Sequence, residues 1–164
     1  MSAPVLGVLL PPDADARRAI AAVVDALALT TDQLPPDFPC QFSAQRREDG
    51  RTASYLLIEH SVDATPHVDE LLRWERPAPE YKELVAAADS RLTVTWRGRK
   101  WVVRCLRALA AALGEASSRT VVENDRGCLL RLSDVVACLR QDPQWSWERE
   151  TFPDLPGVAP SEWL

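Results

Sequence analysis

The stretch QFSAQRREDGRTASYLLIEH, residues 41–60, says most about how this chain folds. Two extended runs, 41–48 and 51–60, flank the dipeptide Asp49-Gly50. An Asp-Gly pair readily adopts the positive φ angles of a two-residue hairpin turn. The sequence therefore predicts a β-hairpin whose strands are joined directly by Asp49-Gly50. Hairpins of this kind favour a mostly antiparallel sheet.

The stretch RLTVTWR, residues 91–97, predicts a further strand with two different faces. Apolar and polar residues alternate along it, and successive side chains of a strand point to opposite sides. One face would hold Leu92, Val94 and Trp96, and the other Arg91, Thr93, Thr95 and Arg97. We expect the first face to pack in the core and the second to be free to meet a partner.

Strands and helices alternate along the rest of the chain. The apolar run 5–10 predicts a buried strand, and a second hairpin is expected from 120–123 and 128–132. Helices with one apolar stripe each are expected to start at Asp13 or Asp15, Val68, Pro79, Val102 and Ser133. Such stripes need a sheet to cover, which predicts an α+β fold with a mostly antiparallel sheet backed by helices.

The order strand, helix, hairpin, helix occurs in residues 1–76 and again in residues 91–141. This recurrence suggests a duplicated β-α-β-β-α unit, although residue identities do not repeat. A total of 164 residues with 46% hydrophobic and 26% charged composition suits one domain, which we place at 1–141. No stretch is long and apolar enough to cross a membrane, and no leader is evident, so a cytoplasmic location is expected.

The last stretch, residues 142–164, differs in composition from the rest. It carries –4 of the net charge of –5, and it combines prolines with aromatic rings. The residues concerned are Pro143, Pro153, Pro156 and Pro160, with Trp145, Trp147, Phe152 and Trp163. So many rings are atypical of disorder. Two hypotheses follow: this tail docks on its own domain, or it engages a partner.

Residue types that carry chemistry are present but not in a recognised pattern. Cys40, Cys105, Cys128 and Cys138 lack zinc-ligand spacing, so we interpret them as reduced, structural thiols.

His60 and His67 lie near Glu59, Asp63, Asp69 and Glu70, where either a metal or acid–base site or an ordinary solvated edge is conceivable. No serine lies in a nucleophile elbow, and no glycine-rich phosphate loop occurs. We therefore predict no catalytic residue, no metal, no cofactor and no enzymatic activity.

One dense basic segment stands out: Arg97, Arg99, Lys100, Arg104 and Arg107, interleaved with Trp96 and Trp101. It can be a solvated helix face, a seat for the acidic tail, or a binding surface. Nucleic acid is disfavoured as the partner because the chain is acidic and carries no nucleic-acid-binding motif. Because arginine and tryptophan dominate protein interfaces, we predict a protein partner that contacts Arg97, Arg99, Trp101 and Arg104.

Two resemblances add functional expectations. The segment ELVAAADSR, residues 83–91, leads into a strand, a helix and a compact hairpin, and over residues 80–140 this order resembles bacterial polymorphic-toxin immunity proteins. That resemblance implies a protein that binds and neutralises a cognate toxin. The recurring order of elements is also similar to duplicated gyrase-inhibitor-like and SOUL-like domains. This second resemblance implies a small hydrophobic or cationic ligand, held between the halves.

Overall fold

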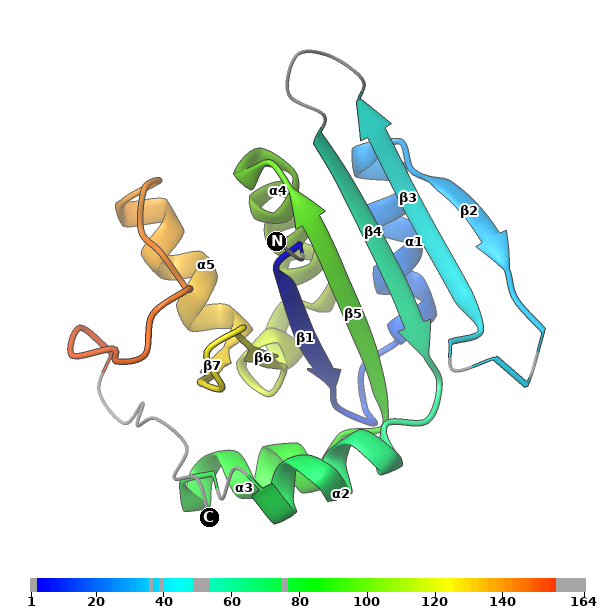
Figure 1. Ribbon diagram of the computed structural model, residues 1–164. Coiled ribbons are helices and arrows are strands. Elements are labelled where there is room, and N and C mark those ends of the chain that lie inside the picture. The colour runs from blue at the N-terminus through cyan, green and yellow to red at the C-terminus, as the bar shows by residue number, and fades with distance from the viewer. Residues whose placement is uncertain (1–2, 36, 39, 49–53, 75–76, 156–164) are drawn as a thin grey trace.

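A single seven-stranded sheet organises the chain, whose computed structural model describes residues 3–35, 37–38, 40–48, 54–74 and 77–155 (Figure 1). The strand order is β2-β3-β4-β5-β1-β6-β7, and every neighbouring pair is antiparallel. The strands are β1 (Val5–Leu10), β2 (Thr30–Gln33), β3 (Phe42–Glu48), β4 (Ser54–Ser61), β5 (Ser90–Arg97), β6 (Val121–Glu123) and β7 (Leu129–Arg131). The predicted α+β class with an antiparallel sheet is confirmed.

Helices cover the two faces of this sheet unequally. They are α1 (Ala16–Leu27), α2 (Thr65–Trp74), α3 (Pro79–Ala87), α4 (Arg99–Leu113) and α5 (Leu132–Gln141), with a short 3-10 helix at Gly114–Ser118. Side chains of α1, α4 and α5 form the main core with one face, called here the covered face. On the other face, α2 and α3 pack against Leu9, Val121 and Leu129, at one end of the sheet (Figure 1).

The remainder of that second face, over β3, β4 and β5, forms a shallow hollow. Its side chains are Gln45, Arg47, Tyr55, Leu57 and Thr95, and we call them the open face. In β5 the predicted alternation is confirmed, because Leu92 and Val94 are buried on the covered face. None of the helices in the described part of the chain is long and apolar enough to cross a membrane.

Helix α1 has the N-terminal cap and the apolar stripe that the sequence predicts. The Asp15 side chain accepts a hydrogen bond from the Arg18 backbone N–H at 3.1 Å, which satisfies a free donor of the first turn. Ile20, Val23 and Leu27 form the buried stripe, whereas Arg18 is exposed. Helix α5 differs from its prediction: it begins at Leu132, so Ser133 lies inside the first turn and does not cap it.

The hairpin of β3 and β4 forms, but its connection is not the predicted two-residue turn. Glu48 pairs with Ser54, so residues 49–53 join the strands, and these residues lie outside the described part. A turn at Asp49-Gly50 would pair Glu48 with Arg51. That odd shift of register would turn Leu56 and Ile58 away from the core, where both are now buried beside Ala44. Core packing therefore outweighs the local turn signal.

The two halves of the chain share an element order but not an arrangement. Strand β5 lies between β4 and β1, so each half supplies a hairpin to the other half's central strand. The first hairpin attaches through its second strand, β4, whereas the second attaches through its first strand, β6. Helices α2 and α5 also lie on opposite faces. The halves are thus not related by a simple two-fold symmetry, and the hypothesis of a duplicated unit lacks that support.

The tail packs on the covered side as far as residue 155, where the description ends. Trp145, Trp147 and Phe152 belong to the main core, and the Trp147 ring meets Trp96 edge-on at 5.9 Å. The Asn124 side chain donates hydrogen bonds to the backbone carbonyls of Trp147 and Arg149, at 2.6 and 2.9 Å. Ring packing and backbone hydrogen bonds therefore hold this part of the tail.

Candidate functional site

The junction of β5 and α4 gathers basic residues at one end of the molecule. Gly98 forms the junction with a φ of 96°, a conformation that favours glycine, and an added Cβ would lie 3.0 Å from that of Ser54. Helix α4 therefore starts immediately after β5. This tight turn places Arg97 beside the start of β4 and Lys100 beside the end of β3.

Trp101, in the first turn of α4, is the residue around which these basic side chains gather. Its ring is 1% exposed, and its indole N–H donates to the Ser54 hydroxyl at 3.3 Å. Three cations lie over the ring, with centroid distances of 4.5 Å for Arg46, 4.9 Å for Lys100 and 5.5 Å for Arg104. Such contacts are attractive because the face of an indole ring is electronegative.

Glu48 ties part of this arrangement together. Its carboxylate accepts from the Lys100 ammonium at 3.0 Å and lies 3.7 Å from the Arg46 guanidinium. The Lys100 hydrogen bond is the main reason why the pKa of Glu48 lies below its ordinary value. The Glu48 carboxylate thus partly neutralises the charges of Lys100 and Arg46. Arg104 is not among its partners, and its side chain is exposed to solvent.

The basic surface continues onto the open face. Arg47, Tyr55 and Arg97 occupy neighbouring register positions on β3, β4 and β5, and Arg47 lies over the Tyr55 ring at 5.7 Å. We call the whole set the cationic end, and it extends over both sides of the sheet. Arg46, Lys100 and Arg104 lie over Trp101 on the covered side, and Arg47 and Arg97 flank Tyr55 on the open face. Sequence reasoning missed Arg46, Arg47 and Tyr55, because only the strand register brings them to β5.

The four predicted contact residues have different surroundings. Arg97 and Arg104 are exposed at the cationic end, and Trp101 lies buried beneath it. Arg99 instead faces the tail: its guanidinium donates to the backbone carbonyls of Pro143 and Trp145, and it lies 4.6 Å from the Trp147 ring centroid. As far as residue 155, the tail therefore meets Arg99 of the basic segment through carbonyl groups and a ring rather than through acidic side chains.

The two histidines lie on opposite faces of the sheet and form no common site. His60 is on the covered face, whereas the Nε2 atom of His67, on α2, lies 2.8 Å from the Glu123 carboxylate. Within the part of the chain that the structure describes, no group of three or more His, Cys, Asp or Glu residues is arranged to hold a metal.

A polar cluster beside His67 explains the single glycine of β1. A Cβ on Gly7 would come within 2.9 Å of the Arg91 guanidinium and 3.1 Å of the Glu123 carboxylate. Arg91 therefore lies across β1 and donates to the Thr93 hydroxyl at 2.8 Å. Burial lowers the pKa of Arg91, and the charges of Glu123 and Glu70 oppose that shift. Arg91 and Thr93, at the start of the predicted polar face of β5, therefore contact other parts of the same chain.

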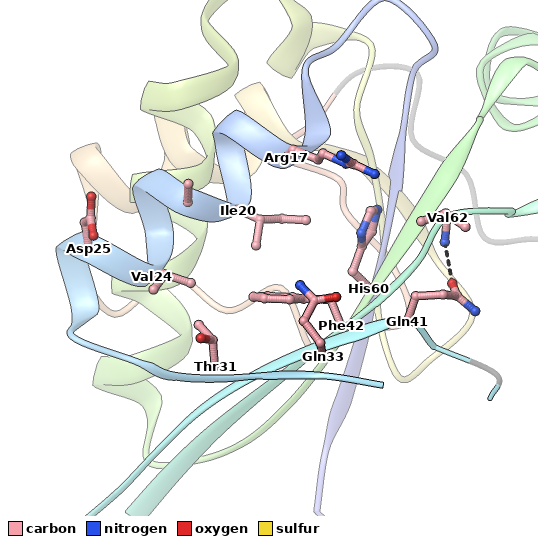
Figure 2. Close-up of a pocket in the computed structure, with 11 residues that line it drawn as sticks. Arg17, Ile20, Val24, Asp25, Thr31, Gln33, Gln41, Phe42, His60 and Val62 are labelled. Atoms are coloured by element: carbon pink, nitrogen blue, oxygen red, sulfur yellow. Dashed lines mark hydrogen bonds between the residues drawn. The ribbon is translucent and has the colours of Figure 1, made fainter. Parts of the chain in front are cut away.

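A cleft of about 470 Å³ opens between α1 and the strands β2, β3 and β4 (Figure 2). It is lined by Arg17, Ile20, Ala21, Val24, Asp25, Thr31, Gln33, Gln41, Phe42, His60 and Val62. Burial, aided by the positive charge of Arg17, holds the pKa of His60 below its ordinary value. All these residues come from the first half, so the cleft is not the inter-half groove that the ligand-binding resemblance implies.

The cysteines offer no reactive group at either place. None of the four forms a disulfide, and three of them are buried. Complete burial raises the pKa of Cys105 to about 12, which keeps it protonated near neutral pH.

No protein-family model matches this chain, and no significant match was found among curated proteins or solved structures.

Proposed function

We propose that this chain is a non-catalytic binding protein whose cationic end holds a carboxylate-rich surface of a protein partner. The stack of Arg46, Lys100 and Arg104 on Trp101 is the observation that supports this proposal most. Stacking restrains long side chains before binding, so less side-chain entropy is lost when the partner docks. Arginine beside aromatic rings is also the composition that dominates protein interfaces.

Charge distribution favours a protein over a nucleic acid as the partner. The chain as a whole carries –5, whereas the cationic end contains five bases, of which Arg46 and Lys100 lie beside the Glu48 carboxylate. A long polyanion would extend beyond this small end and meet the acidic remainder of the molecule. A folded partner can present a compact acidic patch that matches only the cationic end.

The partner class we propose is a bacterial toxin, which the chain neutralises by covering it. This class comes from the resemblance of residues 80–140 to toxin-immunity proteins. Neutralisation by covering needs neither a nucleophile nor a metal, so the proposal requires no enzymatic activity. Reduced thiols suit a cytoplasmic location, where cysteines do not form disulfides.

The test is capture of the partner with matched charge-reversal variants. Immobilised chain is exposed to lysate of the cells that produce it, with the double variant Arg97→Glu/Arg104→Glu and the control Arg18→Glu/Arg73→Glu in parallel. Both variants change the net charge equally, and Arg18 and Arg73 are exposed on α1 and α2. We expect one protein to be retained by the native chain and the control, and to bind the first variant at least tenfold more weakly.

The captured protein is then expressed in a bacterial host with and without this chain. A toxin stops growth when it is alone, and co-expression of the native chain restores growth. A harmless captured protein would contradict the immunity function. Equal capture by both double variants, or no specific capture, would overturn the cationic end as the interface.

A further inference from the structure

We infer that the cleft beside α1 binds a small organic anion that has one carboxylate and an apolar body. This inference is independent of the proposed toxin partner, because the cleft and the cationic end share no residue. Its volume of about 470 Å³ falls in the range of roughly 300–1,000 Å³ that is usual for small-ligand sites.

The cleft wall holds an unsatisfied polar atom. His60 is 6% exposed, and its Nε2 atom has no hydrogen-bond partner in the described part of the chain. Leaving a buried ring nitrogen without a partner costs free energy, so such atoms commonly mark a site that something else fills. A carboxylate oxygen of a ligand would accept a hydrogen bond from a protonated Nε2.

A cation, Arg17, lies next to this histidine. Figure 2 shows the Arg17 side chain reaching from α1 toward the His60 ring. Arg17 is exposed, so it can move to admit a ligand and then donate to it. Two donors from different elements thus converge at one end of the cleft, which favours a carboxylate there.

The middle of the cleft is apolar. Ile20 and Val24 lie one helical turn apart on α1, and Phe42 faces them from β3 (Figure 2). Gln41 belongs to the wall: its amide donates to the Phe38 carbonyl at 2.9 Å and accepts from the Val62 N–H at 3.1 Å. The body of the ligand would therefore contact hydrocarbon.

The far end sets the length and the charge of the ligand. Asp25 is eight residues from Arg17 along α1, a separation of about 12 Å at 1.5 Å per residue. Its carboxylate would repel a second negative charge at that end. A monocarboxylate of about eight carbons fits this spacing better than a dicarboxylate of the same length.

Octanoate, octylamine and octanedioate are the probes for this inference, each titrated into the full chain by calorimetry. We expect octanoate to bind at least tenfold more tightly than the other two, because octylamine carries the wrong charge at Arg17 and octanedioate meets Asp25. Equal binding of octanoate and octylamine would show an apolar surface only. Absence of octanoate binding at millimolar concentrations would also overturn the inference.

Arg17→Gln and Arg18→Gln form the matched pair of variants, since both residues are exposed on α1 and only Arg17 lines the cleft. Arg17→Gln should weaken octanoate binding at least fivefold, and Arg18→Gln should leave it unchanged. In the native chain, octanoate should raise the pKa of His60 in an NMR titration of its ring proton. Equal effects of the two variants, or no movement of that pKa, would place octanoate elsewhere. Partner capture is unaffected by this outcome.

Discussion

Trp147 and Trp101 are both 1% exposed and both lie beneath arginine, yet the two sites differ in what the cation does. Over Trp147, Arg99 donates to two backbone carbonyls of the tail, so its charge fastens the chain to itself. Over Trp101, Arg104 remains exposed to solvent. Arginine over tryptophan thus serves stability at Arg99, which has internal acceptors, and suits recognition at Arg104. Arg46 and Lys100, the other cations over Trp101, are held internally by Glu48.

Removal of the tail should have the largest effect on stability, because it removes Trp147 together with its neighbouring rings. Deletion of residues 142–164 exposes the surface that Trp145, Trp147 and Phe152 cover. At roughly 1.5–3 kcal/mol for each large buried side chain, the free energy of unfolding should fall by about 5 kcal/mol or more. A thermal melt should show a midpoint lower by about 10 °C or more. A soluble product with an unchanged melt would contradict the structural role of the tail.

Replacement of each ring separately asks whether the two sites support the fold equally. Trp147→Ala and Trp101→Ala should each lower the free energy of unfolding by about 3–5 kcal/mol, since both leave a large cavity. Urea unfolding measures both losses. A small loss at Trp101 alone would mean that its ring is held for binding rather than for the core.

Replacement of Arg99 and of Arg104 by alanine should change the free energy of unfolding by different amounts. Arg99→Ala leaves two tail carbonyls without their charged donor, which should cost about 1.5–3 kcal/mol. Arg104→Ala should stay within about 0.5 kcal/mol of the native stability, because an exposed side chain is lost. Urea unfolding of both variants checks the difference. Equal losses of stability would contradict the claim that Arg99 supports the fold whereas Arg104 does not.

Another arginine beside a ring, Arg17 beside His60, extends the comparison to a titratable ring. Burial and the Arg17 charge hold the pKa of His60 below its ordinary value of 6.5. The unfolded chain therefore binds this proton more readily, so the contribution of His60 to stability is complete above pH 6.5 and is lost as the pH falls below it.

Arg17→Gln should raise the pKa of His60, because it removes the neighbouring positive charge. The loss of stability between neutral and acidic pH should then become smaller, and this is the smallest effect that we predict. Unfolding at pH 7.5 and pH 5.5 measures the loss, with Arg18→Gln as the control. An NMR titration in which the pKa of His60 does not respond to Arg17→Gln would show that burial alone sets it.

Local patterns predicted the elements well. Alternation identified β5, the apolar run identified β1, and Asp15 with its stripe identified α1. Strand β2 escaped prediction because all four of its residues are exposed and leave no apolar pattern. It follows that an edge strand with no buried side chain cannot be found by hydrophobic periodicity.

The candidate sites were less accessible to sequence reasoning. The cationic end requires the register that sets Arg47 opposite Tyr55 and Tyr55 opposite Arg97, and that register follows from packing between distant segments. The role of Arg99 depends in the same way on the path of the tail. Arg97 and Arg104 were predicted because their charge density is visible in a single segment. Whether they bind a partner stays a prediction.

The place of β5 between β1 and β4 has a consequence for the order of folding during synthesis. Until residue 97 has left the ribosome, β1 has neither of its partners, and β4 is paired only with β3. The emerging chain therefore carries open strand edges that invite pairing with other chains. Sheet closure waits for a late strand to insert between two early ones, a long-range step that makes folding slow. A chaperone that shields those edges would raise the yield of folded protein without changing its stability.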